Sequence, residues 1–148
     1  MKSKIFSLAI LMMALGFVSC SSDDDSQTVE QVTPIAAAGF KWKENGGAEI
    51  TADEAYFETA YKTIKASKGT PGTTGYQFVE INLSGTAPAT YTVGSGNAVS
   101  TLAGYVASAG SVVVSSNASG KMSGTVTSTG SGSGVTSFDA TFTDIEVR

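Results

Sequence analysis

The stretch QFVEINL, residues 77–83, alternates apolar and polar side chains. Val79, Ile81 and Leu83 fall on one face of an extended chain, and a glutamate and an asparagine fall on the other. A strand with one apolar and one polar face is typical of an antiparallel sheet that covers a core on one side. This stretch therefore predicts an all-β fold.

Similar short stretches lie on either side of it, separated by turn residues. Asn45-Gly46 predicts a type I′ hairpin turn, because both of its positions need positive φ, and residues 117–120 predict a second turn. Residues 51–54 fit a helix capping box as well as the start of a strand. The stretches expected to form strands are 40–43, 48–51, 61–66, 77–83, 90–93, 102–106, 110–115, 121–127 and 135–147.

The last of these stretches changes phase. Phe138 and Phe142 share one face, but the apolar positions then shift to Ile145 and Val147. Such a flip requires an extra residue in the strand, so a β-bulge is expected near residues 143–144. The side chains expected in the core are Val79, Ile81, Leu83, Val112 or Val114, Phe138 and Phe142.

These signals together predict a single antiparallel β-sandwich or barrel-like domain of about eight short strands. It occupies residues 40–148, which is long enough for one core. The domain is expected to fold without metal.

The composition excludes several kinds of site. The chain has one cysteine and no histidine, which removes disulfide frameworks, histidine triads and histidine metal sites. Its net charge of −4 argues against a nucleic-acid partner. The glycine-rich segments 94–99 and 130–134 lack the residues that complete a dinucleotide or phosphate loop. We therefore expect no catalytic residue, no metal site and no cofactor.

The N-terminus carries a targeting pattern. Lys2 and Lys4 precede an apolar run over residues 5–18, which is shorter than the roughly 20 residues of a membrane-spanning helix. A basic start, a short apolar run and small residues at its end indicate a secretory signal peptide. Residues 1–19 are expected to be removed.

The string Phe17-Val18-Ser19-Cys20 resembles a bacterial lipobox. The resemblance implies cleavage before Cys20 and diacylation of its thiol with palmitate-type chains. Two or more acyl chains anchor a protein stably. The chain is therefore expected to be attached to the outer membrane through Cys20.

An acidic run follows the cysteine. Ser22, Asp23, Asp24 and Asp25 resemble the surface-export signal of Bacteroidota lipoproteins, which implies a domain that faces the cell exterior. A periplasm-facing anchor and a plain polar spacer are the alternatives. Residues 20–39 contain acids but no bases and are expected to form an acidic flexible tether.

The body of the chain carries a further pattern, in the order Trp42, 45–47, 63–66, 80–83, 90–93, 111–114, 122–127 and 140–145. In this order it resembles small Bacteroidota surface lipoproteins that carry an all-β domain of unknown function. The resemblance implies the compartment and an all-β fold, and it adds no activity and no site residue.

Two kinds of functional side chain remain to be considered. The acids of the body cluster at Asp53-Glu54 and at Asp139, Asp144 and Glu146, but neither cluster has aromatic platforms beside it like those expected around a glycosidase pair. The aromatic side chains that offer a sugar-binding platform are Trp42, Tyr56, Phe57, Tyr61, Tyr76, Tyr91 and Tyr105. A position in the core is the competing interpretation, and for Trp42 it is the stronger one.

The sequence therefore predicts a non-catalytic, surface-exposed outer-membrane lipoprotein. It would act as a ligand-binding, adhesion or accessory module with a glycan or a protein as its ligand. The alternatives are a structural or assembly partner of an outer-membrane complex and a carboxylate-dependent enzyme that acts on glycans.

Overall fold

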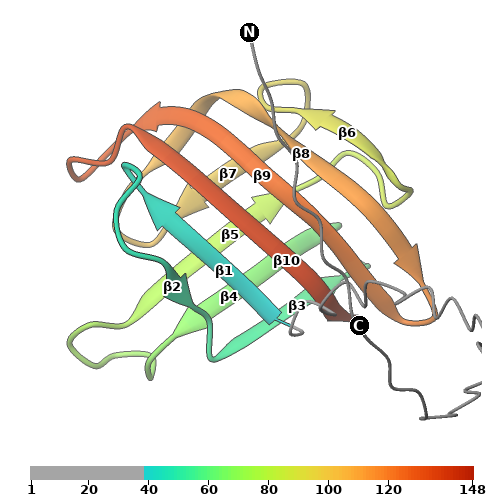
Figure 1. Ribbon diagram of the computed structural model, residues 1–148, viewed down its shortest axis with the longest axis horizontal. Helices are drawn as coiled ribbons and strands as arrows, with labels where there is room; N and C mark the ends of the chain where they lie inside the picture. Colours follow the sequence, from blue (N-terminus) through green and yellow to red (C-terminus); the bar gives the residue numbers. More distant parts are fainter. Residues whose placement is uncertain (1–38) are drawn as a thin grey trace, which may run out of the picture. The chain divides into compact units, whose positions relative to one another are not determined.

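A computed structural model describes residues 39–148, in which ten strands and no helix are found (Figure 1). The all-β prediction is confirmed for this part of the chain. The strands are β1 Gly39–Glu44, β2 Ile50–Thr51, β3 Glu54–Glu58, β4 Thr63–Lys68, β5 Gln77–Asn82, β6 Ala89–Thr92, β7 Ala98–Thr101, β8 Val106–Ala118, β9 Lys121–Ser131 and β10 Ser137–Val147.

Seven of these strands close into a barrel. β3, β4, β5 and β7 pair in turn, and β7 meets β8 where Ser100 pairs with Val106. β9 then joins β8 to β10, and the end of β10 returns to β3. β1 lies along β10 and carries β2, and β6 lies along β8. Figure 1 shows β8, β9 and β10 as long neighbouring strands that form one wall.

The closure corrects the expectation of a purely antiparallel domain. β10 and β3 are parallel, with Glu146 beside Tyr56 and Val147 beside Phe57. The Arg148 N–H donates to the Phe57 carbonyl at 2.8 Å. This pairing joins the end of the chain to a strand near its start, which local alternation does not encode.

Both expected turns are confirmed. Asn45 and Gly46 have φ of 51° and 65°, and they follow β1 in the loop that leads to β2. Ser119 and Gly120 have φ of 54° and 71°, and they join β8 to β9. The two long strands reach further than expected on either side of the second turn.

The phase change in β10 is also confirmed as a bulge. The register between β9 and β10 shifts between Phe142 and Ile145, and Asp144 has a φ of 48°. The Ser123 hydroxyl donates to the Asp144 carboxylate at 3.2 Å. The bulge returns Ile145 to the interior.

The strand expected over residues 102–106 is wrong. Residues 102–104 form the turn between β7 and β8, and the strand lies earlier, over Ala98–Thr101. Gly104 has a φ of 105°, and the Leu102 N–H donates to the Phe78 carbonyl at 2.8 Å. These two features turn the chain where its apolar composition suggested a strand.

Three further boundaries differ from the expectation. The segment that starts at residues 51–54, which fitted both a helix capping box and a strand, leads into the strand β3. The strand expected over residues 61–66 lies two residues later, as β4. The glycine-rich segment 130–134 is partly strand, because β9 continues to Ser131. The domain therefore has ten strands where about eight were expected from turn spacing.

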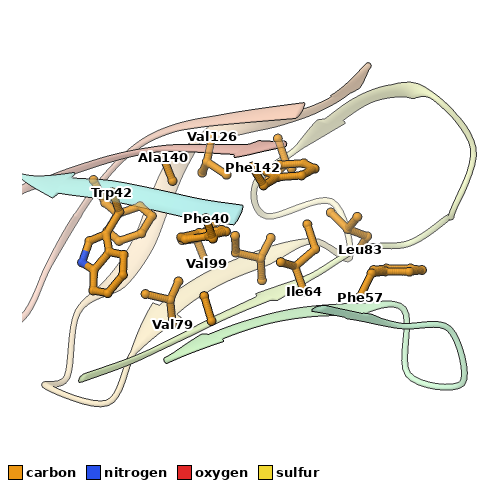
Figure 2. Packing of buried hydrophobic residues seen from close by; sticks show 14 of the residues in the cluster. Phe40, Trp42, Phe57, Ile64, Val79, Leu83, Val99, Val126, Ala140 and Phe142 are labelled. Carbon is orange, nitrogen blue, oxygen red and sulfur yellow. The ribbon is translucent and has the colours of Figure 1, made fainter. Parts of the chain in front are cut away.

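Side chains from β1, β9 and β10 meet those of β3, β4 and β5 in the interior (Figure 2). Phe40 lies between Trp42 and Phe142, with ring centroids 6.0 and 6.4 Å apart respectively. The side chains expected in the core are all buried: Val79, Ile81, Leu83, Val112, Val114, Phe138 and Phe142. The expectation was that either Val112 or Val114 would be buried, and the structure buries both.

Candidate ligand site at one end of the barrel

Several strands begin or end together at one end of the barrel, here called the Glu44 end. β1 ends there at Glu44, β4 at Lys68 and β7 at Thr101, and β5 begins there at Gln77 (left side of Figure 1). A cavity of about 140 Å³ lies at this end, and its lining includes Trp42, Glu44, Tyr76, Phe78, Thr101 and Leu102. The mouths of β-barrels are common places for small-molecule sites.

Trp42 brings a buried donor to this cavity. It pairs with Ala140 on β10, and its side chain faces the interior with 1% of its surface exposed. Its Nε1 atom has no hydrogen-bond partner in the described part of the chain. Figure 2 shows this nitrogen on the side of the ring away from the other labelled core side chains. An indole N–H can only donate, and no atom of residues 39–148 accepts from it.

Glu44 brings an acceptor to the same cavity. It stands two residues after Trp42 on β1 and pairs with Phe138, so both side chains point to the inner face of the sheet. Glu44 is half-buried, and among residues 39–148 its carboxylate makes neither an ion pair nor a hydrogen bond. A carboxylate only accepts hydrogen bonds. One strand therefore presents a donor and an acceptor on the same face of the sheet, and both residues line the same cavity.

Hydrogen bonds hold the loops around the mouth in place. The Asn45 side chain donates to the Gly134 carbonyl at 2.9 Å and accepts from the Thr136 N–H at 2.8 Å. The Ser133 hydroxyl donates to the Ala103 carbonyl. Asn45 was expected only as a turn residue, because nothing local signals a bond to residues about 90 positions away. These bonds tie the three loops around the mouth to one another.

Two half-buried aromatic rings extend the site outward. Tyr76 and Phe78 line the cavity and also a groove of about 360 Å³ over the outer face of β3, β4 and β5. Phe78 was not among the aromatic side chains expected to offer a platform. Its signal was present, since Phe78 falls on the polar face of the stretch 77–83, where an aromatic side chain is out of pattern.

Charged side chains border this groove as three ion pairs: Asp53–Lys68, Glu54–Arg148 and Lys65–Glu58. The Gly69 N–H and then the Lys68 ammonium hydrogen-bond the Asp53 carboxylate, and they lower its pKa. Each acid of the three pairs faces a base, and Arg148 is shared with Glu146, so within residues 39–148 the groove borders carry no unpaired cation.

The aromatic candidates differ in how far their rings are exposed. Trp42, Phe57, Tyr91 and Tyr105 are buried, so none of them presents a free ring face. The Tyr105 hydroxyl hydrogen-bonds the Ser128 hydroxyl at 3.0 Å in the interior. The exposed or half-buried ones are Tyr61, Tyr56 beneath the Arg148 guanidinium at 4.1 Å, and Tyr76 at the mouth.

Most members of the acidic clusters make hydrogen bonds or ion pairs in the structure. Asp53 and Glu54 are both engaged with cations, and Glu146 pairs with Arg148 at 2.9 Å. Asp144 accepts the Ser123 hydroxyl at the bulge. Among residues 39–148 no group of three or more histidines, cysteines and acids is placed to hold a metal ion.

The residues expected to carry the lipid and the export signal lie outside the described residues. These are Cys20, Ser22, Asp23, Asp24 and Asp25. Within the part that the structure describes, no helix is long and apolar enough to cross a membrane.

Comparison with known proteins yields no match to a family model, to a curated protein or to a solved structure.

Proposed function

We propose that residues 39–148 form a non-catalytic binding module that takes a small ligand at the Glu44 end of the barrel. The observation that carries the proposal is the buried Nε1–H of Trp42, which lacks an acceptor at the edge of a cavity. A buried donor without a partner costs about 1–3 kcal/mol. A ligand atom that accepts this hydrogen bond would recover that energy on binding.

The acids at Asp53-Glu54 support binding rather than catalysis at that cluster. A general acid works best when its pKa is raised toward the working pH. Asp53 shows the opposite, because the Gly69 N–H and Lys68 lower its pKa. Its neighbour Glu54 is held in an ion pair with Arg148 at 2.9 Å.

We also propose that the module belongs to a surface lipoprotein of the Bacteroidota type described above. Acyl chains on Cys20 would anchor it in the outer membrane, and the acidic run 23–25 would direct it to face outward. Support for this comes from the order of signal peptide, cysteine and acidic residues along the chain.

Binding is tested most directly through Trp42, because it is the one tryptophan of the chain. The full chain in detergent should show a saturable change in tryptophan fluorescence with a compound from a panel of small polar molecules, peptides and glycans. The compound should be recovered unchanged, since turnover would contradict the non-catalytic role. If no panel compound changes the fluorescence, the cavity holds only water and the proposal is wrong.

Replacing Cys20 by alanine should release the protein from the membrane fraction and abolish its labelling by a fatty-acid probe. The reason is that no other cysteine is available for the thioether. Cell fractionation and lipid labelling measure the effect, with Ser21→Ala as the matched control. Unchanged membrane recovery with retained label would contradict the anchor.

Replacing Asp23, Asp24 and Asp25 by alanine should protect the protein from protease added to intact cells, while leaving it in the membrane fraction. The acidic run would then act as the outward address rather than as a spacer. Ser26→Ala serves as the control. Equal digestion of the triple variant and the control would leave the acids with only a spacer role.

A further inference from the structure

We infer that the ligand of the Glu44 end is an uncharged, polyhydroxylated ring, as in a neutral sugar unit. This inference rests on the proposed binding function and names the chemistry of its ligand. One hydroxyl group of the ring would accept a hydrogen bond from Trp42 Nε1–H. The same hydroxyl would donate a hydrogen bond to the Glu44 carboxylate.

Elimination among ligand groups supports this choice. A hydroxyl is both a donor and an acceptor, so it can serve Trp42 and Glu44 together. A ligand carboxylate would accept from Trp42 but would stand beside the like charge of Glu44. A ligand ammonium would pair with Glu44 but has no lone pair for the indole N–H. A neutral hydroxyl therefore fits both unpaired groups of the cavity.

The apolar lining fits the rest of such a ring. Leu102 lines the cavity with 62% of its surface exposed, and the half-buried Tyr76 and Phe78 stand where the cavity meets the outer groove. The C–H faces of a sugar ring are apolar, and broad aromatic faces provide a surface for them. The Leu102 backbone is held by its bond to the Phe78 carbonyl at 2.8 Å, so this wall is fixed before a ligand arrives.

The dimensions indicate that the ring is the end of a longer chain. The cavity of about 140 Å³ is smaller than the roughly 300–1,000 Å³ of most small-molecule sites, so it accommodates only part of an extended ligand. The groove of about 360 Å³ shares Tyr76 and Phe78 with the cavity. Because the ions beside the groove are paired with one another, the following units are expected to be neutral as well.

The indole N–H of the single tryptophan is the reporter for the test. Nuclear magnetic resonance on the ¹⁵N-labelled full chain in detergent would follow its cross-peak. The probes are galactose and glucose, the disaccharides lactose and maltose, and four charged analogues of the same rings: galacturonate, glucuronate, galactosamine and glucosamine. At least one neutral probe should shift the cross-peak saturably, with its charged analogues at least about tenfold weaker. A disaccharide should bind more tightly than its monosaccharide.

Two cavity variants sharpen the test. Glu44→Gln should weaken the neutral probe about tenfold, because it replaces a charge-assisted hydrogen bond with a neutral one. Trp42→Phe should weaken binding of the neutral probe about tenfold, as measured by calorimetry. Its unfolding midpoint should fall by less than this loss of binding would suggest, because the substitution also removes an unpaired buried donor. Glu49→Gln is the matched control, because Glu49 pairs with Lys41 on the outer face and should leave binding unchanged.

The outcomes separate this inference from the proposed function. If a charged analogue binds more tightly than its neutral counterpart, the ligand class is wrong and the binding module stands. The same holds if the sugars leave the cross-peak unmoved while another panel compound shifts it. If no compound of either set moves the cross-peak, both proposals fail. Equal effects of Glu44→Gln and Glu49→Gln would remove Glu44 from the site and overturn the hydroxyl assignment.

Discussion

Replacing Phe142 by alanine should lower the free energy of unfolding by about 3–5 kcal/mol. Phe142 is fully buried and stacks on Phe40 at 6.4 Å across the pairing of β1 with β10. Its loss removes apolar contacts and leaves a cavity that the hydrogen-bonded strands around it cannot collapse to fill. The cost is a large part of the roughly 5–15 kcal/mol that stabilises a small domain.

Denaturant melts followed by circular dichroism measure this effect in the full chain and in the fragment that starts at Gly39. Glu80→Ala is the matched control, since Glu80 lies on the outer face of β5 and accepts one hydrogen bond from Asn82 at 3.0 Å. It should cost about 1 kcal/mol or less. Equal costs for the two variants, or a helical spectrum of the fragment, would refute the assignment of faces.

Replacing Gly124 by alanine should also destabilise the domain, by about 3 kcal/mol or more. Gly124 lies in β9 opposite Phe142 on one side and Val114 on the other. A Cβ atom there would collide with the Val113 carbonyl oxygen and with the ring of Phe142. The carbonyl belongs to the β8 ladder and cannot move without breaking strand pairing, so the clash is not relieved cheaply.

The control for this variant is Gly120→Ala at the tip of the β8–β9 hairpin. A Cβ atom there meets nothing within 4 Å, and the φ of +71° should cost only about 1–2 kcal/mol. The Gly124→Ala and Phe142→Ala changes should be non-additive when combined, because removing the ring relieves part of the clash. If Gly120→Ala lowers the free energy of unfolding as much as Gly124→Ala does, the close approach of Phe142 to β9 is not the reason that position 124 requires glycine.

The local features of the fold were readable from the sequence because each depends on neighbouring residues. Alternation identified the strand over residues 77–83 and its buried face. The demand for positive φ identified the turn at Asn45-Gly46, and the change of phase identified the bulge before Ile145. The signal and the acidic run after Cys20 are also sequence predictions, and they rest on the order of residues alone.

Closure of the barrel was not readable in this way. It depends on β10 reaching β3 in parallel, through pairs such as Val147 with Phe57 that lie far apart in sequence. The strand predicted over the apolar stretch 102–106 was wrong for a related reason. The hydrogen bond from the Leu102 N–H to the Phe78 carbonyl is a tertiary contact, and the chain turns there. Here the tertiary contact overrides the local strand preference of the stretch.

The candidate site shows the same division. The sequence favoured a core position for Trp42, but the strand expected there ended at residue 43, before Glu44. Only the tertiary structure decided that the ring is buried while its N–H remains unpaired beside a cavity. Whether a donor finds a partner depends on what the facing strands bring within about 3 Å, and β5 and β7 bring no acceptor to Trp42.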